Sequence, residues 1–359
     1  MLVINKITVP GYKMVLEGVD SNAGFHCFIA IHDITLGPAL GGTRIYPYAS
    51  TEAALQDVLR LSKAMTYKAA VAKTGTGGGK SVIIASPSKD KTPALFTAFA
   101  EMVNSLNGEY YAAEDIGSTI EDIMFIRQKT PYVCASEAEG SSGEPSRFTA
   151  WGVFRGIQAV SQKIWNTSSV KGRTIAVQGL GNVGAKLADI LFWHGANLIL
   201  TDIDENKLHH LCQIYGAKQM HPEEIYAAEC DIFAPCALGG ILNDKTIPQL
   251  NCKAVAGGAN NQLLQDQNGE QLAQRGILYA PDFVINAGGV INAACELEEN
   301  GYDPIVSRDR VEQIYDSMLS IFSHHEVEKK STHVIANELA EHNLKFGIGK
   351  KPDWNRGGG

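Results

Sequence analysis

The sequence predicts an α/β protein with two domains. Its 359 residues are enough for two hydrophobic cores. Short β-branched and aromatic runs alternate with amphipathic helical segments, which is the pattern of α/β folds. Residues 140–147, GSSGEPSR, are dense in Gly, Ser and Pro and are the best linker candidate. We therefore expect an N-terminal mixed α/β domain and a second α/β domain after it.

The composition excludes several classes of partner. The formal net charge of −8, with no basic cluster, argues against binding to nucleic acid or to an anionic membrane surface. The seven cysteines show no C-x-x-C spacing, which indicates free thiols in a reducing cytoplasm. The N-terminus lacks the apolar core of a signal peptide, and no run of about 18 apolar residues occurs. We expect a cytoplasmic protein without a membrane segment, and we assign no metal site.

The first domain alternates strands and helices around a glycine-rich loop. Its predicted elements are the strands 13–19 and 26–32 and the helices 51–65 and 92–106. Between the second strand and the first helix lies LGPALGGTRIYPY, in which Gly37, Gly41 and Gly42 predict a loop rather than regular structure.

The segment from Met65 to Lys80 carries the first candidate for catalysis. Lys68 and Lys80 flank an apolar stretch that ends in three glycines, residues 77–79, where backbone and ligand can approach closely. The β-branched run that follows predicts a strand, so Lys80 stands where a flexible loop enters rigid structure. The glycine spacing does not match a P-loop. A solvated lysine after a turn is the alternative.

A second candidate lies in YYAAEDIGST. Residues 110–113 are predicted as a strand, and Asp115 stands at its carboxyl end, the edge where ligands bind in α/β sheets. The alternative is that Asp115 or Ser118 only caps the helix that IEDIMFIRQ predicts.

The second domain contains the most specific motif of the chain. Strand 174–178 is followed by GLGNVG, a helix, and strand 197–201 ending at Asp202, which is the full context of a dinucleotide fingerprint. Gly179 makes the tight turn, Gly181 lets the backbone approach a pyrophosphate, and Gly184 permits close packing of helix on strand. Asp202 would bind both ribose hydroxyls and repel a 2′-phosphate. The sequence therefore predicts a Rossmann-type domain that binds NAD rather than NADP.

The rest of this domain repeats the succession of strand and loop. Three hydrophobic runs end in small residues or amides, as expected of loops around a nicotinamide ring: residues 230–240, 254–263 and 278–289. Helices are predicted over residues 290–298, 308–322 and 331–341, and the polar, glycine-rich tail from residue 349 is expected to be disordered.

Together, Lys68, the segment from Gly77 to Lys80, the segment from Ala113 to Asp115 and GLGNVG resemble the Glu/Leu/Phe/Val amino-acid dehydrogenases, most of all the leucine dehydrogenases. The resemblance covers nearly the whole chain. It implies that Lys80 and Asp115 perform the proton chemistry and that the active site lies in the cleft between the domains. It also implies a substrate and oligomerisation domain of residues 1–133 plus 331–359, an NAD-binding domain of residues 134–330, and self-association as dimers or octamers.

The resemblance extends to binding residues. The implied substrate-binding residues are Lys68, which would hold the α-carboxylate, and Leu40, Gly41, Ala113, Asn261, Val290 and Ala293. The implied cofactor-binding residues are Thr149, Gly179, Gly181, Asn182, Val183, Gly184, Asp202, Cys236, Ala237, Asn260 and Asn286. A Lys80 that is buried beside Lys68 would have a lowered pKa, because desolvation and a like charge both disfavour the ammonium.

Two positions indicate an apolar substrate side chain. Glutamate dehydrogenases carry a lysine where this chain has Leu40 and a serine where it has Ala293, so a glutamate carboxylate would find no partner here. Leucine dehydrogenases usually have valine in place of Ala293, which leaves room for longer side chains. We expect reversible, NAD-dependent deamination of leucine or another branched-chain amino acid to the 2-oxo acid and ammonia, with phenylalanine or tryptophan as the alternative.

Two other classes of function remain in view. A non-catalytic NAD-binding sensor would not need Lys68, Lys80 and Asp115. A 2-hydroxy-acid dehydrogenase needs a catalytic histidine paired with a carboxylate, and no histidine stands in a comparable loop at a strand end.

Overall fold

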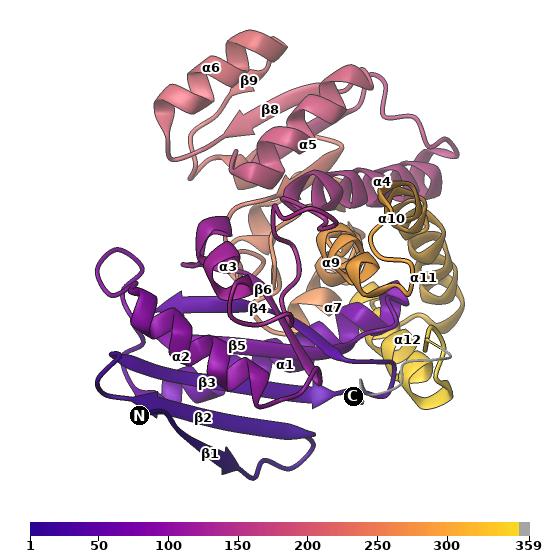
Figure 1. Cartoon of the computed structure of the whole chain (residues 1–359). Coiled ribbons are helices and arrows are strands. Elements are labelled where there is room, and N and C mark those ends of the chain that lie inside the picture. Colours follow the sequence, from indigo (N-terminus) through magenta and orange to yellow (C-terminus); the bar gives the residue numbers. More distant parts are fainter. Residues whose placement is uncertain (352–359) are drawn as a thin grey trace. The chain divides into compact units, whose positions relative to one another are not determined.

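The computed structural model describes residues 1–351, so most of the expected disordered tail, residues 352–359, lies outside the described residues (Figure 1). The chain divides into two compact units. Unit 1 comprises Met1–Glu144, Val290–Pro304 and the described residues from Ala340 onward, and unit 2 comprises Pro145–Gly289 and Ile305–Leu339. The first boundary falls inside the predicted linker. Against the expected domains, residues 134–144 and 290–304 group with unit 1, and residues 331–339 group with unit 2.

Unit 1 is built on a six-stranded mixed sheet in the order β1-β2-β3-β5-β4-β6. Its strands are β1 (Val3–Ile7), β2 (Met14–Asp20), β3 (Phe25–Asp33), β4 (Ala39–Tyr46), β5 (Gly77–Ile84) and β6 (Tyr110–Glu114). Three pairs of neighbouring strands are antiparallel: β1 with β2, β2 with β3, and β3 with β5. Strand β4 pairs in parallel with both β5 and β6. The mixed α/β architecture predicted for the N-terminal domain is confirmed.

Helices cover both faces of this sheet. Val82 of β5 packs with Ala54 and Val58 of α1 (Thr51–Ala72), while the neighbouring Ile83 packs with Phe99 of α2 (Pro93–Asn104) on the other face, where α3 (Ile120–Arg127) also lies (Figure 1). This follows from the alternation of side chains along a strand. Strand β5 is therefore buried on both faces, which makes it a rigid support for a functional side chain.

Unit 2 contains a fully parallel sheet in the order β12-β11-β10-β7-β8-β9. Its strands are β7 (Thr174–Gln178), β8 (Asn197–Thr201), β9 (Lys218–Gln219), β10 (Ile232–Pro235), β11 (Ala254–Val255) and β12 (Leu278–Tyr279). Its helices include α4 (Ser146–Trp165), α5 (Asn182–Trp193), α6 (Glu205–Tyr215), α7 (Gln267–Gln274), α8 (Asp282–Ile285), α10 (Pro304–Glu312) and α11 (Ile314–Glu328). The order turns back at β7, as in doubly wound folds, so the predicted Rossmann-type domain is confirmed.

Helices α9 (Gly288–Ala294) and α12 (Thr332–Phe346) each contribute residues to both units. Within unit 1, the end of α12 is fixed to α1, because Tyr67 donates a hydrogen bond to Glu341 and Asn343 donates one to the carbonyl of Ala70. No helix within residues 1–351 combines the length and apolar composition needed to cross a membrane.

Two glycine-rich segments predicted as loops are strands. Gly41 and Gly42 lie within β4, and Gly77–Gly79 begin β5, so Lys80 lies inside a strand rather than at the end of a loop. The reason is close approach rather than flexibility. A Cβ on Gly41 would lie 1.8 Å from the carbonyl oxygen of Gly79, and one on Gly78 would lie 2.1 Å from the backbone nitrogen of Thr66.

Helix bounds also differ from those predicted, most clearly in two places. Helix α1 continues to Ala72 instead of ending at residue 65, so Lys68 lies on a helix. It ends where Lys73 adopts a left-handed conformation with a φ of 51°. The single helix predicted over residues 308–322 is two helices, α10 and α11, that meet at Gln313.

Candidate active site

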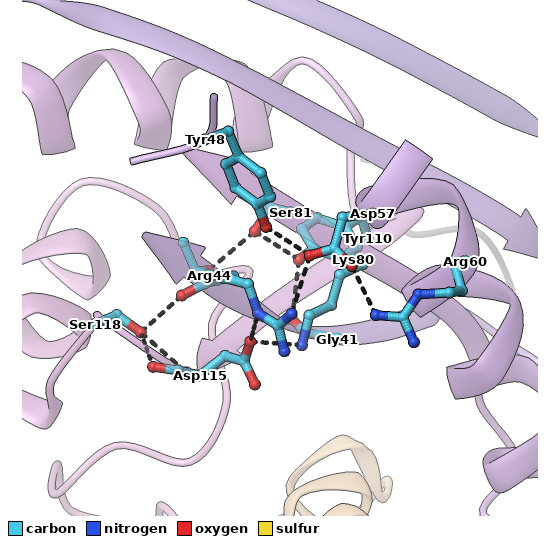
Figure 2. A network of polar contacts seen from close by, with 11 residues as sticks. Gly41, Arg44, Tyr48, Asp57, Arg60, Lys80, Ser81, Tyr110, Asp115 and Ser118 are labelled. Carbon is cyan, nitrogen blue, oxygen red and sulfur yellow. Dashed lines mark hydrogen bonds and ion pairs between the residues drawn. The ribbon is translucent and has the colours of Figure 1, made fainter. Parts of the chain in front are cut away.

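The structure brings Lys80 and Asp115 together within unit 1 (Figure 2). Lys80 Nζ lies 3.0 Å from Asp115 Oδ2, and the lysine is only 5% exposed. The two residues come from β5 and from the carboxyl end of β6, which lie on either side of β4. A Cβ on Gly42 of β4 would lie 2.7 Å from Asp115 Cβ and 3.2 Å from Lys80 Nζ. Glycine at this position therefore leaves the space in which the pair meets.

Asp115 does not cap the following helix. Thr119 is the N-cap of α3, and it forms a capping box with Asp122. Ser118 has a different task, because its hydroxyl donates to the carbonyl of Thr43 and accepts from the backbone N–H of Asp115. The capping alternative for these two residues is therefore wrong, and the Asp115 carboxylate faces Lys80 instead.

Sequence reasoning missed Arg44. Its Nε donates to Asp115 Oδ2 at 2.9 Å, and its Nη1 donates to Asp57 Oδ2 on α1, also at 2.9 Å (Figure 2). Gly42 and Arg44 share one face of β4, because alternate residues of a strand point the same way. The alternation of side chains along β4 could have indicated Arg44, but it has no meaning when the segment is interpreted as a loop.

Two more side chains donate hydrogen bonds to Asp57. Tyr48 donates to Asp57 Oδ2 at 2.6 Å, and Arg60 Nη2 donates to Asp57 Oδ1 at 2.8 Å. We call Arg44, Tyr48, Asp57, Arg60, Lys80 and Asp115 the charged network.

The charged network perturbs the acid–base properties of the candidate pair. Burial lowers the pKa of Lys80, Asp115 opposes this shift, and the guanidinium of Arg44 adds to it. Burial would raise the pKa of Asp115, but the charges of Lys80 and Arg44 outweigh it, so this pKa lies below the usual value. The pKa of Lys80 is lowered in the expected direction, and Arg44 is a neighbouring like charge. Lys68 lies half-buried on α1.

The residues predicted to surround the substrate side chain gather in an apolar cluster of unit 1. Leu40 and Ala293 are buried there with Cys134, Ala135 and Ala294, and Tyr111, Ala113, Val290 and Leu297 pack against them. Gly41 follows Leu40 on β4. Asn261, the remaining predicted substrate residue, belongs to unit 2, where it has a φ of 53°. The sequence did not single out Cys134, Ala135, Tyr111 or Leu297, because no local pattern links them to Leu40.

The fingerprint glycines of unit 2 serve different purposes. A Cβ on Gly184 would lie 1.9 Å from the carbonyl oxygen of Gly179, which itself has a φ of 89°. Apart from its chain neighbours and the backbone of its own helix, a Cβ on Gly181 would meet no atom of residues 1–351 within 4 Å, although Gly181 is the N-cap of α5. Helix α5 begins at Asn182, with Val183 in its first turn, so free backbone N–H groups and the positive helix end point to the same place. The open space at Gly181 fits a pyrophosphate.

Asp202 stands beside a pocket of about 480 Å³ at the end of β8. Its Oδ2 accepts a hydrogen bond from the backbone N–H of Leu180, and its Oδ1 accepts one from Asp204. The residues of this pocket include the acids Asp202, Glu205 and Glu224 but no lysine or arginine. The pocket is suited to a ribose with free hydroxyls.

The other predicted cofactor residues lie on the loops after β7, β10 and β11 and on nearby helices of unit 2. Asn286 Nδ2 donates to Asn260 Oδ1 at 2.9 Å, while its buried Oδ1 has no hydrogen-bond partner among the described residues. Cys236 Sγ accepts from the backbone of Gly258, and Thr149 Oγ1 donates to the carbonyl of Pro145. Ala237 is the nearest neighbour of a Cβ placed on Gly179. The unpartnered amide oxygen of Asn286 is available to a ligand donor such as a carboxamide.

Comparisons with known proteins identify the family. A model of the Glu/Leu/Phe/Val dehydrogenase dimerisation domain matches residues 14–132, and a glutamate/leucine/phenylalanine/valine dehydrogenase model matches residues 199–350. The chain is 48% identical over 335 residues to the leucine dehydrogenase of Geobacillus stearothermophilus. These residues cover 93% of this chain and 91% of that protein. The phenylalanine dehydrogenase of Lysinibacillus sphaericus is 45% identical over 361 residues, covering 97% and 94%.

A solved structure agrees. The L-tryptophan dehydrogenase from Nostoc punctiforme matches with a TM-score of 0.82 at 44% sequence identity, covering 94% of this chain and 97% of that chain. The chain therefore belongs to the Glu/Leu/Phe/Val dehydrogenase family and is an amino-acid dehydrogenase. These enzymes are NAD(P)-dependent oxidoreductases.

Substitutions of Gly181 and Gly184 should affect different properties, cofactor binding for Gly181 and folding stability for Gly184. Gly181→Ala should leave the free energy of unfolding nearly unchanged but weaken NADH binding by at least about 10-fold, because the added methyl group enters space left for the ligand. Gly184→Ala, the matched control, should lower the free energy of unfolding by about 1–3 kcal/mol, because its methyl group collides with backbone. Denaturant titration and NADH fluorescence measure the two effects. Unimpaired NADH binding by the Gly181 variant would contradict the assignment.

Proposed function

We propose that the protein catalyses the reversible, NAD-dependent oxidative deamination of an L-amino acid with an apolar side chain to a 2-oxo acid and ammonia. The contact between buried Lys80 and Asp115 is the observation that carries the proposal. Bound NAD would supply the hydride acceptor. Gly181, Asn182 and Val183 would hold its pyrophosphate, Asp202 its ribose, and Thr149, Cys236, Ala237, Asn260 and Asn286 the nicotinamide half.

The roles of the unit 1 residues follow from their charges. Lys68 would hold the substrate α-carboxylate with a fixed positive charge. Asp115, with its lowered pKa, is ionised at neutral pH and can accept a proton from the substrate ammonium and return it later. Lys80, with its lowered pKa, can give up its proton more readily than an exposed lysine and assist the attack of water.

The apolar cluster supports an apolar substrate side chain. Leu40, Ala113, Val290 and Ala293 would contact it, and a buried carboxylate among them would cost several kcal/mol without a partner. We place leucine and other branched-chain amino acids first. Phenylalanine and tryptophan are the second candidates, because the alanines of the cluster leave space and because relatives named for these substrates are similar at 45% identity.

We also propose that unit 1 carries substrate binding and self-association and that unit 2 binds NAD. The match of residues 14–132 to a dimerisation domain supports self-association. A dimer or an octamer is the assembly that we propose. A requirement for ammonia distinguishes the proposed function from that of a 2-hydroxy-acid dehydrogenase. Only an amino-acid dehydrogenase that runs in reverse requires ammonia to consume a 2-oxo acid and NADH.

Lys80 and Asp115 should be needed for turnover rather than for folding. Lys80→Ala and Asp115→Asn should lower kcat by about 100-fold or more, the usual scale of acid–base assistance. Arg44 still neutralises Asp115 when Lys80 is removed, so the fold should persist. Lys91→Ala, which removes a lysine–aspartate pair outside the charged network, is the control and should keep kcat. Steady-state kinetics with circular dichroism test this, and a near-normal kcat in either variant removes that residue from the mechanism.

NAD should be preferred over NADP by at least about 100-fold in kcat/KM. A 2′-phosphate would enter a pocket lined by the acids Asp202, Glu205 and Glu224 together with His221, and no lysine or arginine is among the described residues that line it. The comparison needs both cofactors at saturating leucine. Asp202→Ser, which removes one of the three acids, should narrow the ratio. Equal or better use of NADP by the unaltered enzyme would refute the assignment.

Ala293 should set the upper limit on side-chain size. Ala293→Val adds two carbons to the apolar cluster and should lower kcat/KM for phenylalanine and tryptophan relative to leucine by about 10-fold or more. Glutamate should be disfavoured by about 1,000-fold or more in the unaltered enzyme. A substrate panel followed at the NADH absorbance measures both ratios. If Ala293→Val raised kcat/KM for the largest accepted side chain, the pocket assignment would be wrong.

A further inference from the structure

The charged network contains one cation more than it can balance. Arg44 and Arg60 face the two aspartates Asp57 and Asp115, so these four groups are neutral together. Lys80 is the fifth charge and the most deeply buried, with a side-chain exposure of 6% against 57% for Arg60. An arginine does not lose its proton in a protein, whereas a buried lysine can. The proton of Lys80 is therefore the charge that the network releases most easily.

Arg44 and Lys80 contact the same atom. Both donate to Asp115 Oδ2, at 2.9 and 3.0 Å, so the two cationic nitrogens lie within about 6 Å of each other. Asp115 Oδ1 has no hydrogen bond or ion pair within the described part of the chain, and the side chain is 20% exposed (Figure 2). One oxygen of the carboxylate is thus fixed by two cations, and the other is left for proton exchange.

We propose that Arg44 is a positioning residue of the reaction: it orients Asp115 with Oδ1 presented to the substrate, and it keeps Asp115 negative while Lys80 gives up its proton. This inference rests on the function proposed above for Lys80 and Asp115. Without Arg44, a neutral Lys80 would leave the half-buried carboxylate of Asp115 without any cation in contact, and the pair would hold one proton between them. Asp57, fixed by Tyr48 and Arg60, holds Arg44 in turn.

The proposal predicts that removing either partner of the ion pair between Arg44 and Asp57 shifts the pKa of Lys80, in opposite directions. Removing Arg44 removes a like charge near Lys80, so the pKa of Lys80 should rise. Removing Asp57 removes an opposite charge, so the pKa should fall. The titratable and charged groups that the neighbouring elements bring to this layer are His32 of β3, Arg44 of β4 with Tyr48 after it, Asp57, Arg60 and Lys68 of α1, and Glu114 and Asp115 at the end of β6. Apart from the substituted residue itself, each variant keeps all of these groups.

The test measures the protonation of Lys80 without turnover. Acetylation of Lys80 with trace acetic anhydride is quantified by mass spectrometry across a pH series in the full chain. Arg44→Gln should move the midpoint up by about one pH unit or more, which makes Lys80 roughly 10-fold less reactive below it. Asp57→Asn should move it down by a smaller amount, because Asp57 lies behind Arg44. Arg155→Gln removes an arginine–carboxylate pair of unit 2 and should leave the midpoint unchanged.

Arg44→Lys separates charge from geometry. One ammonium keeps the positive charge but cannot reproduce the fork that joins two carboxylates, so the midpoint should return toward that of the unaltered enzyme while kcat stays at least about 10-fold low. A purely structural role for Arg44 predicts no shift or shifts of the same sign for Arg44→Gln and Asp57→Asn, and either result overturns the proposal. If Arg44→Gln does not fold, Asp57→Asn alone decides: an acetylation midpoint that stays the same or rises in this variant overturns the proposal. Because labelling needs no substrate, failure of the proposed reaction would show separately, as unimpaired kcat in Lys80→Ala.

Discussion

The contact between Lys80 and Asp115 is the constraint around which unit 1 is arranged. Burying two opposite charges is unfavourable unless their geometry and remaining hydrogen bonds are satisfied. The parallel strands β5, β4 and β6 bring the two residues to one place, and Gly42 leaves the space between them. Arg44 then links this pair to Asp57 on α1. Sheet and helix are therefore joined by the same charges that are proposed to perform the chemistry, so the chemistry and the packing of α1 cannot vary independently.

Close approach of backbone explains why both regions of function are rich in glycine. In unit 1, Gly41 and Gly78 lie within strands because a side chain would collide with the neighbouring strand or with α1. In unit 2, Gly184 lets α5 pack on the turn, whereas Gly181 faces open space. A glycine that collides with protein is required by the fold, and one that faces empty space at a helix N-terminus is suited to a ligand. The sequence motif contains both kinds and does not distinguish them.

The sequence predicted those features that depend on neighbouring residues. The Rossmann-type sheet, the family and the placement of Asp115 at a strand end all follow from short motifs in their local context. Arg44 could not be predicted in the same way, because its partners Asp57 and Asp115 are 13 and 71 residues away along the chain. Similarly, glycines within a packed sheet look like a loop when neighbouring strands are unknown. The errors therefore fall where long-range packing, rather than local preference, decides the structure.

Strand β4 connects the two parts of the proposed site in unit 1. Leu40 belongs to the apolar cluster, and Arg44, four residues later, belongs to the charged network. Gly42 between them adjoins both Asp115 and Lys80, so a larger residue there would disturb the pair. The residues that pack with Leu40 in the apolar cluster are small or apolar. If Leu40 and Ala293 contact the substrate as proposed, this arrangement would let the accepted side chain change at these two positions while the charged network stays the same. Relatives named for leucine, phenylalanine and tryptophan at 45–48% identity are consistent with such a division, because substrate choice then depends on a few positions that overall identity does not reveal.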